Sequence, residues 1–280
     1  MTEGPQLDLL ADALRDAAIK DERALMEFPF FSLEKRPRME PIVYDDGRVR
    51  IEIQPGHRGV ATIWDKEILI YLASIINDRL ERGLPAERTI RFRAREFLRT
   101  ARRNLNDEGY RLFEDALERL RSTMVKTSLV GGTPRRDRAG FGWIDSYRIS
   151  ARELSNGREI MGHVEVTLNK WTFDMIMKGR RLLTISPEYF NITSSLERRL
   201  YELARKHCGQ QPEWRIGLPR LAEKVGVAKD RPLRKFKSDL LRIQLRGSLP
   251  EYQMGLETGP GGASQAEYMA VVFTPRPAGG

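Results

Sequence analysis

Hydrophobic residues recur every three to four positions in three successive stretches of the C-terminal third of the chain. The three stripes are Leu196, Leu200, Leu203 and Ala204; Leu218, Leu221, Ala222 and Val225; and Leu233, Phe236, Leu240 and Ile243. Because an α-helix makes one turn in about 3.6 residues, each stripe predicts an amphipathic helix, and Gly226 predicts the end of the second one. Strand-like segments follow at 252–256 and 268–273. A short middle helix, a longer third helix and then two strands is the order of a winged helix-turn-helix domain.

The N-terminal part of the chain shows the same order of elements in a different sequence. Helical spacing predicts helices from Asp65 to the Gly-Leu-Pro at 83–85, over 94–105 and over 110–120. Short strands are predicted over 51–62 and at 89–92, 125–130, 143–149 and 160–168, and a short helix at 171–178. We therefore predict an α+β fold with two tandem winged-helix domains.

The predicted units of the chain follow from these elements. They are an N-terminal arm and strap at 1–40, a first winged-helix domain at 41–178, a junction at 179–187, a second winged-helix domain at 188–275 and a loose tail at 276–280. The junction is where a hinge between the domains is expected.

Positive charge is concentrated in the three C-terminal helices. The chain of 280 residues carries a net charge of +9, and residues 194–246 alone hold 14 Lys and Arg against 6 Asp and Glu, a net +8. A basic balance without an apolar run of the ~18 residues that a membrane span needs indicates a nucleic-acid partner. The single cysteine, Cys208, excludes an internal disulfide, fits a reducing cytoplasm and is expected to be a small buried residue.

The polar face of the third C-terminal helix is the first candidate DNA contact. Opposite its apolar stripe lie Arg231, Lys235, Ser238 and Arg242, with Arg234 beside them and Lys237 added as a further basic candidate. In a major groove, Arg reads guanine edges and Lys neutralises phosphate. The alternative is a solvated helix surface, but the order of helices and the local charge favour DNA.

Two basic segments of the first domain are candidates for backbone contacts. One is the helical stripe Arg95, Arg99, Arg102 and Arg103, and the other is the Gly/Arg loop 131–142, with Arg135, Arg136 and Arg138 at its tip. A basic wing laid along DNA is favoured for this loop over a solvated hairpin tip. Because Glu114, Asp115 and Glu118 lie on the first domain's third helix and repel phosphate, the second domain is expected to supply most base reading.

Residues 1–30 are predicted to be a polar arm with a short amphipathic helix. Within it, Gln6, Leu7, Asp8, Leu9 and Leu10 resemble the pentapeptide by which bacterial replication proteins dock on the sliding clamp, with Leu10 where Phe is favoured. The opening turn of an ordinary helix is the favoured alternative. The aromatic cluster of Phe28, Phe30, Phe31 and Leu33 is expected to be a strap over a domain core rather than a docking motif.

An enzyme that nicks DNA is the rival from another class. Such nickases hold a metal with two histidines separated by one residue, but His57, His163 and His207 are far apart in sequence. Metal-ligand spacing and acid/base pairs are likewise missing, so the sequence predicts no catalytic residues, no metal and no cofactor. A winged-helix transcriptional repressor is the nearer alternative.

Four longer motifs carry a family resemblance that extends over residues 20–257. LERRLYELARKHCGQQPEWRIGL, TIWDKEILIYLAS, MEFPFFSLEK and PEYF resemble the plasmid replication initiator protein A family of bacteria. This resemblance implies binding to repeated origin sites (iterons), local duplex opening and helicase loading with the host initiator. It also implies a monomer–homodimer equilibrium, with repression of the protein's own gene by the dimer and control of plasmid copy number.

Overall fold

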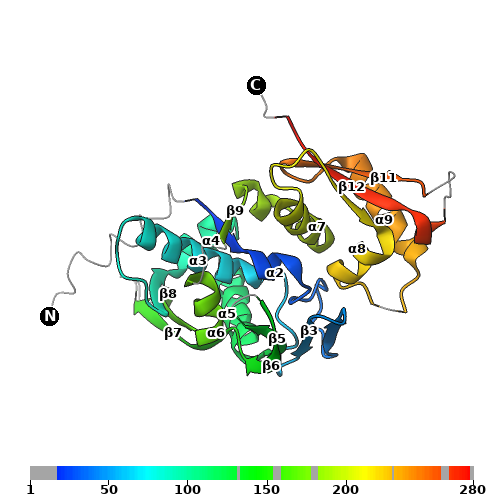
Figure 1. Cartoon of the computed structure of the whole chain (residues 1–280). Helices are drawn as coiled ribbons and strands as arrows, with labels where there is room; N and C mark the ends of the chain where they lie inside the picture. Colours follow the sequence, from blue (N-terminus) through cyan, green and yellow to red (C-terminus); the bar gives the residue numbers. More distant parts are fainter. Residues whose placement is uncertain are drawn as a thin grey trace.

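The chain folds into two α/β parts that lie side by side, with helix α7 (Ser195–His207) between them (Figure 1). This computed structural model describes residues 18–130, 133–153, 159–177, 182–228, 230–259 and 265–277, and side chains within them except those of 130, 133–139, 152, 153, 159 and 160. The mixed α/β class agrees with the prediction.

The first part surrounds the long helix α3 (Lys66–Glu81) with two antiparallel sheets and three further helices. Its other helices are α4 (Ala94–Thr100), α5 (Asp107–Ser122) and α6 (Lys170–Met177). One sheet has the order β2 (Ile42–Asp45), β3 (Arg50–Gln54), β5 (Met124–Val130) and β6 (Thr133–Phe141); the other has the order β4 (Thr89–Arg93), β8 (Glu159–Leu168) and β7 (Ile144–Glu153). Every residue of α3 from Lys66 to Ile76 is buried, which places this helix in the centre of the molecule.

The second part contains the three predicted C-terminal helices in the predicted order. After α7 come β10 (Trp214–Gly217), α8 (Leu218–Val225), α9 (Leu233–Arg246), β11 (Tyr252–Glu257), the one-turn 3-10 helix η4 (Ala266–Tyr268) and β12 (Ala270–Pro275). The strands form an antiparallel sheet with the order β10, β12, β11. Helix α7 begins where the Ser194 hydroxyl accepts a hydrogen bond from the Glu197 N–H, and α8 ends where Gly226 takes a φ of +85°.

Residues 18–36 tie the two parts together. Strand β1 (Lys20–Glu22) pairs with β9 (Leu182–Thr184), and helix α2 (Arg23–Glu27) packs on α7. Phe30 and Phe31 are buried against Trp143, with ring centroids 5.4 Å and 4.8 Å away. The strap interpretation of this aromatic cluster is therefore confirmed.

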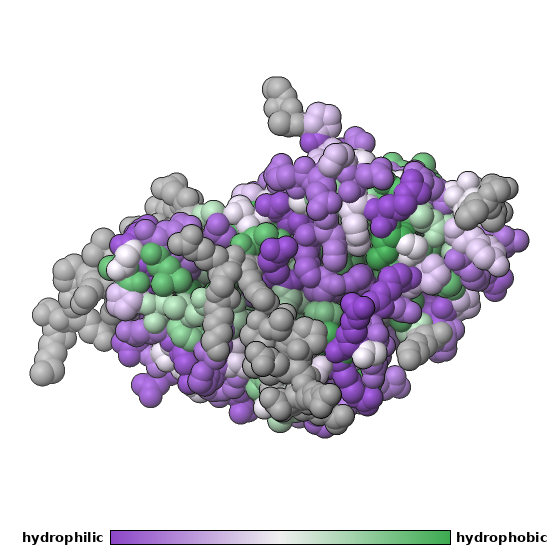
Figure 2. Space-filling model, viewed as in Figure 1, coloured by the Kyte–Doolittle hydropathy of each residue, from purple (hydrophilic) through white to green (hydrophobic). Residues whose placement is uncertain are grey.

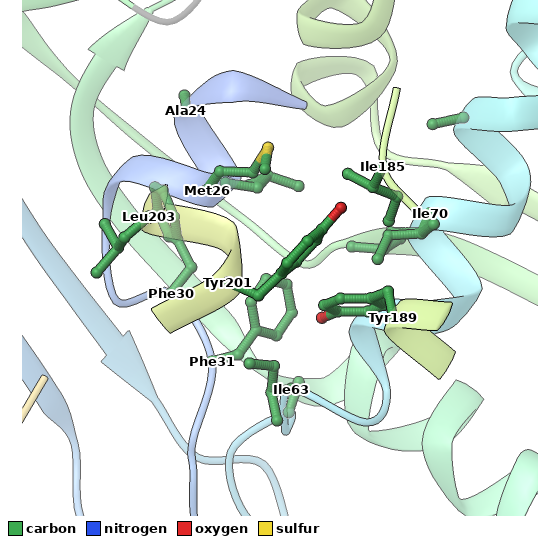
Figure 3. Close-up of a cluster of buried hydrophobic side chains, with 14 of the residues drawn as sticks. Ala24, Met26, Phe30, Phe31, Ile63, Ile70, Ile185, Tyr189, Tyr201 and Leu203 are labelled. Atoms are coloured by element: carbon green, nitrogen blue, oxygen red, sulfur yellow. The ribbon is translucent and has the colours of Figure 1, made fainter. Parts of the chain in front are cut away.

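One continuous apolar core fills both parts and the space between them. Figure 3 shows its centre, where side chains from the N-terminal segment, α3 and α7 meet the 3-10 helix η2 (Pro187–Asn191). Met26 and Phe30 come from the N-terminal segment, Ile70 from α3, Tyr189 from η2 and Leu203 from α7. Folding of either part therefore depends on apolar surface that the other supplies.

The polar-arm prediction is wrong for residues 18–30, where the chain is part of the core. Ile19, Leu25 and Met26 are buried there together with the carboxyl groups of Asp21 and Glu22. The charged residues made this stretch resemble a solvated arm, but one of them, Asp21, pairs with a buried lysine that is described below. The predicted amphipathic helix at 7–14 lies outside the described residues.

Three element boundaries also differ from the prediction. The helix predicted over 94–105 ends at Thr100, because Arg102 takes a positive φ of 53° and the Arg103 N–H bonds the Leu98 carbonyl at 2.7 Å. The predicted loop 131–142 is mostly strand β6, because Phe141 is buried and stacks on Trp171 at 4.1 Å.

The third difference concerns the junction at 179–187. Its middle is strand β9, and the Ile185 N–H donates to the Ile19 carbonyl at 2.9 Å. Ile185 is also buried in the common core. The strand pairing joins this segment to the N-terminal one, which a local pattern could not reveal.

Candidate nucleic-acid interface

Helix α9 presents a polar face to solvent because its apolar side is anchored in the second part. Phe236, Leu240 and Ile243 are buried, and Gly247 ends the helix with a φ of 56°. A helix of 14 residues is about 21 Å long at ~1.5 Å per residue, which suits a DNA major groove.

Arg234, Lys235, Ser238 and Arg242 are exposed on that face, as the sequence pattern predicts. Arg234 and Lys235 have no carboxylate partner among the described residues. The Ser238 hydroxyl donates to the Arg234 carbonyl at 3.0 Å, and Lys237 lies half-buried at the edge of the face. Two cations that no described carboxylate neutralises are therefore available to an anionic ligand.

Asp239 organises the two other arginines of the predicted set. Arg231 precedes the first turn of α9 and pairs with Asp239, while Arg242 Nη1 lies 3.4 Å from Asp239 Oδ1. These arginines are thus held beside the helix by a shared carboxylate. A phosphate that displaced Asp239 would gain two guanidinium groups already in place.

A cleft of about 450 Å³ separates this side of α9 from the strap. Four arginines contribute to its walls, namely Arg38, Arg231, Arg242 and Arg246. Each has a carboxylate partner, since Arg38 pairs with Glu34 at 2.8 Å and Arg246 pairs with Glu197. The arginines of the cleft are therefore held in ion pairs. Arg234 and Lys235 on the outward face of α9 differ, since they have no carboxylate partner among the described residues.

The predicted arginine stripe of the first part is divided among different environments. Arg95 is exposed with no partner among the described residues, and Arg99 lies 3.5 Å from Glu96. Arg102 and Arg103 lie beyond the end of α4; Arg102 is 3.5 Å from Glu188, and Arg103 binds the buried Glu67 through Nε at 2.9 Å and Nη2 at 2.6 Å. The four side chains consequently do not form one basic stripe, and Arg103 has a structural role.

Two of the acidic residues on helix α5 form local ion pairs. Asp115 lies 3.2 Å from Arg111, and Glu118 lies 2.7 Å from Arg121. The hydrogen bond from Arg121 and the charge of the same guanidinium hold the pKa of Glu118 below its usual range. Because α5 carries five acidic residues against three basic ones, it offers an anionic ligand little attraction.

Arg135, Arg136 and Arg138 lie in strand β6 rather than at a loop tip. The β5–β6 register shifts between Thr127 and Leu129, opposite these residues. Their side chains lie outside the described part of the chain, as do Gln6, Leu7, Leu9 and Leu10. Their proposed contacts with DNA and with the sliding clamp stay predictions.

A buried ionic cluster between the two parts was missed by the sequence reasoning. Lys66 of α3 is fully buried, with Nζ 2.7 Å from Asp21 Oδ2 and 2.8 Å from Glu202 Oε1. Burial raises the pKa of Asp21 to about 6 despite the nearby lysine. On α7, Arg199 donates to Glu202 Oε2 at 3.1 Å and to the Met26 carbonyl at 2.9 Å.

A second buried pair lies beside it and uses the residue after Lys66 and the residue before Arg199. Arg198 of α7 pairs with Glu67 of α3, and its guanidinium carbon lies 4.1 Å from the centre of the Trp64 ring. Arg198 and Arg199 are therefore unavailable to DNA, although both contribute to the local charge excess. One signal could have pointed to this cluster: Lys66 and Glu67 begin a helix whose next nine residues, 68–76, carry no charge.

Glu27 forms a third group of contacts at the same junction. Lys206 and Lys224 both pair with it, and His207 Nε2 lies 2.7 Å from its Oε2. Burial by itself would raise the pKa of Glu27, but the close contact with His207 and the charge of Lys206 hold it well below its usual range. Helices α2, α7 and α8 are thereby fixed to one another.

Metal-binding groups and membrane-spanning helices are both absent from the described residues. No group of three or more His, Cys, Asp or Glu side chains within them is placed to hold a metal ion. None of their helices is long and apolar enough to cross a membrane. Cys208 is buried as expected, and burial raises the pKa of its thiol.

Comparison with known proteins places the chain in a family. The profile of the family described as Replication initiator protein A matches residues 20–254. This chain belongs to the replication initiator protein A family. A relative of this initiator from Wigglesworthia glossinidia brevipalpis, named "Putative replication protein", is 33% identical over 246 residues, which cover 88% of this chain and 87% of the relative.

Two solved structures share the fold of this initiator at low sequence identity. Domains 2 and 3 of RctB match with a TM-score of 0.62 at 12% identity, covering 90% of this chain and 98% of that one. The Pi initiator protein, solved in complex with iteron DNA, matches with a TM-score of 0.51 at 17% identity, covering 77% and 92% of the two chains. The arrangement of both parts is therefore shared with other proteins.

Proposed function

We propose that this replication initiator binds repeated double-stranded sites, iterons, at a plasmid origin through two tandem winged-helix domains. The order α7, α8, α9, β11, β12 supports this interpretation of the second part, with α9 as the helix that enters the major groove. The Pi initiator, whose structure includes iteron DNA, supports the choice of ligand.

The observation that carries the proposal is the outward face of α9. Arg234 and Lys235 are exposed there without a carboxylate partner in the described chain, whereas α5 of the first part carries five acidic residues against three basic ones. We therefore assign most base reading to the second part. The first part contributes backbone contacts and dimerisation.

The further steps follow from the family. Binding promotes opening of the origin and loading of the helicase with host replication proteins, and a homodimer in equilibrium with the monomer represses the protein's own gene. The protein acts by binding in the cytoplasm and catalyses no covalent step. Control of plasmid copy number is the consequence of these two activities.

A DNase footprint on DNA flanking the protein's own gene, at physiological salt, tests the proposal. We expect regularly spaced direct repeats to be protected one by one. Arg234→Ala should weaken protection, whereas Arg82→Ala should not, because Arg82 lies at the far end of α3 from α9 (Figure 1). Lys235→Ala should flatten the log–log salt slope by about 0.9 if the ammonium group neutralises one phosphate.

Two other outcomes would replace the proposal. Protection of a single inverted repeat at the promoter and nothing else would identify a repressor. A covalent protein–DNA adduct after incubation with supercoiled origin DNA would identify a nicking enzyme.

A further inference from the structure

The outward face of α9 changes its chemistry along the helix. Its first half carries Arg234 and Ser238, and its second half carries Leu241 and Leu245 in the same row of side chains. Leu241 is 40% exposed and Leu245 is 86% exposed, the largest value among the exposed large hydrophobic side chains of the described residues. In the view of Figure 2 the second part is mostly hydrophilic, with a hydrophobic patch among the polar residues. Along the helix, the exposed neighbours of the two leucines are Arg242, Gln244 and Arg246.

Leu241 and Leu245 do not pack in the hydrophobic core. The row from Arg234 to Leu245 lies opposite Phe236 and Leu240, which are completely buried. Single exposed leucines are ordinary on protein surfaces, but two of them one turn apart beside unpaired cations indicate a contact surface.

Thymine is the base that suits such side chains. In the major groove it presents a C5-methyl group, while the other bases present mainly hydrogen-bonding groups at their edges. Helices that lie along the groove read bases from positions i, i+3, i+4 and i+7, which from Arg234 gives Lys237, Ser238 and Leu241. Leu245 follows one turn later, about 6 Å along the axis at ~1.5 Å per residue, or roughly two base-pair steps.

We propose that Leu241 and Leu245 select thymines by contact with their methyl groups. The recognised site then has thymine at two positions about two base pairs apart, beside the positions that Arg234 reads. This inference rests on the proposed DNA-binding role of α9. A protein partner fits the face less well, because covering the leucines would remove Arg234 and Lys235 from water with no charge to compensate them. The phosphates of DNA supply that charge.

Replacement of thymine by deoxyuridine tests the proposal, because it removes the methyl group and leaves base pairing unchanged. The probe is a fluorescent duplex selected from a randomised library by the full-length protein, with each thymine replaced in turn. Anisotropy titrations should show about fourfold weaker binding at each contacted position, the value for burying one methyl group. Leu241→Ala and Leu245→Ala should each make binding insensitive to one replacement, as in a double-mutant cycle.

Leu80→Ala is the matched control, since Leu80 is 42% exposed on α3, far from α9. This variant should keep the full response to both replacements. Wild-type binding that no replacement weakens would overturn the thymine contact and leave the DNA-binding proposal standing. Failure of the wild-type protein to select any duplex would instead overturn the DNA-binding proposal itself. Loss of self-association in the leucine variants, with unchanged deoxyuridine response, would assign the leucines to a protein interface.

Discussion

Removal of the Lys66 ammonium group is the perturbation with the clearest expected size. Its Nζ lies between Asp21 Oδ2 at 2.7 Å and Glu202 Oε1 at 2.8 Å, with no exposure to solvent. Lys66→Met keeps the length of the side chain and removes its charge. Glu202 would still have Arg199 as a partner, but Asp21 would keep only the Glu22 N–H, 2.8 Å from its Oδ1.

The expected loss of unfolding free energy is about 3–5 kcal/mol, the usual result of removing one partner from a buried ion pair. This loss depends on pH through Asp21. Burial already raises the pKa of Asp21 to about 6 in the folded protein, and removing the lysine raises it further. A carboxyl group whose folded pKa lies above its unfolded value destabilises the protein as pH rises through that window. The loss should therefore be largest at pH 8 and smaller at pH 5.

Urea unfolding followed by tryptophan fluorescence measures this difference at both pH values. Lys170→Met is the matched control, because Lys170 is 74% exposed and its Nζ lies 2.8 Å from Asp174 Oδ2. That variant should lose less than about 1 kcal/mol, as exposed pairs do. If the two variants lost equal stability at pH 8, or if the Lys66→Met loss did not change with pH, the structural role assigned to the cluster would be refuted.

Three further predictions concern other parts of the molecule. Burial raises the pKa of Glu22 to about 7, so the stability of the protein should fall as pH rises toward 7. In urea titrations, Glu22→Gln should raise the unfolding free energy by about 1–2 kcal/mol at pH 8 and by little at pH 4. Gly226→Ala should lower the unfolding free energy by about 1 kcal/mol or more beyond the loss caused by Gly83→Ala, measured by thermal unfolding. Both glycines have a positive φ, but only a Cβ at position 226 would lie 2.8 Å from Pro29. Equal losses of stability would contradict this contact. Arg234→Ala should weaken binding to the best selected duplex by about 1–3 kcal/mol in anisotropy titrations, and an unchanged affinity would remove it from the base contacts.

The elements of the second part could be predicted because each helix buries only one side. The stripes through Leu200, Leu221 and Leu240 therefore appear at helical spacing, and Gly226 ends α8 where the sequence indicates. The exposed face of α9 follows from the same periodicity. The spacing of hydrophobic residues is therefore sufficient to predict a helix when only one side of that helix is buried.

The buried charges could not be predicted, because their partners are remote in sequence. Glu67 and Arg198 pair across 131 positions, and Lys66 and Asp21 across 45. An isolated arginine or lysine on an amphipathic helix is ordinarily exposed, and nothing local in the sequence marks Arg198 and Arg199 as buried. The same limitation made 131–142 look like a loop, since its glycines outweighed a strand pairing that only the fold supplies.

The shared ionic core also limits how this protein can evolve. A crossover between two relatives would join one part of this chain to the other part of a relative. Here Lys66 and Glu67 come from one part and Glu202 and Arg198 from the other, so a crossover near the midpoint would combine charges that were selected with different partners. Such hybrids would contain buried charged side chains without matching partners, even if each part were intact in its own parent protein. The exposed face of α9 can diversify residue by residue, whereas the two parts of the chain must descend together.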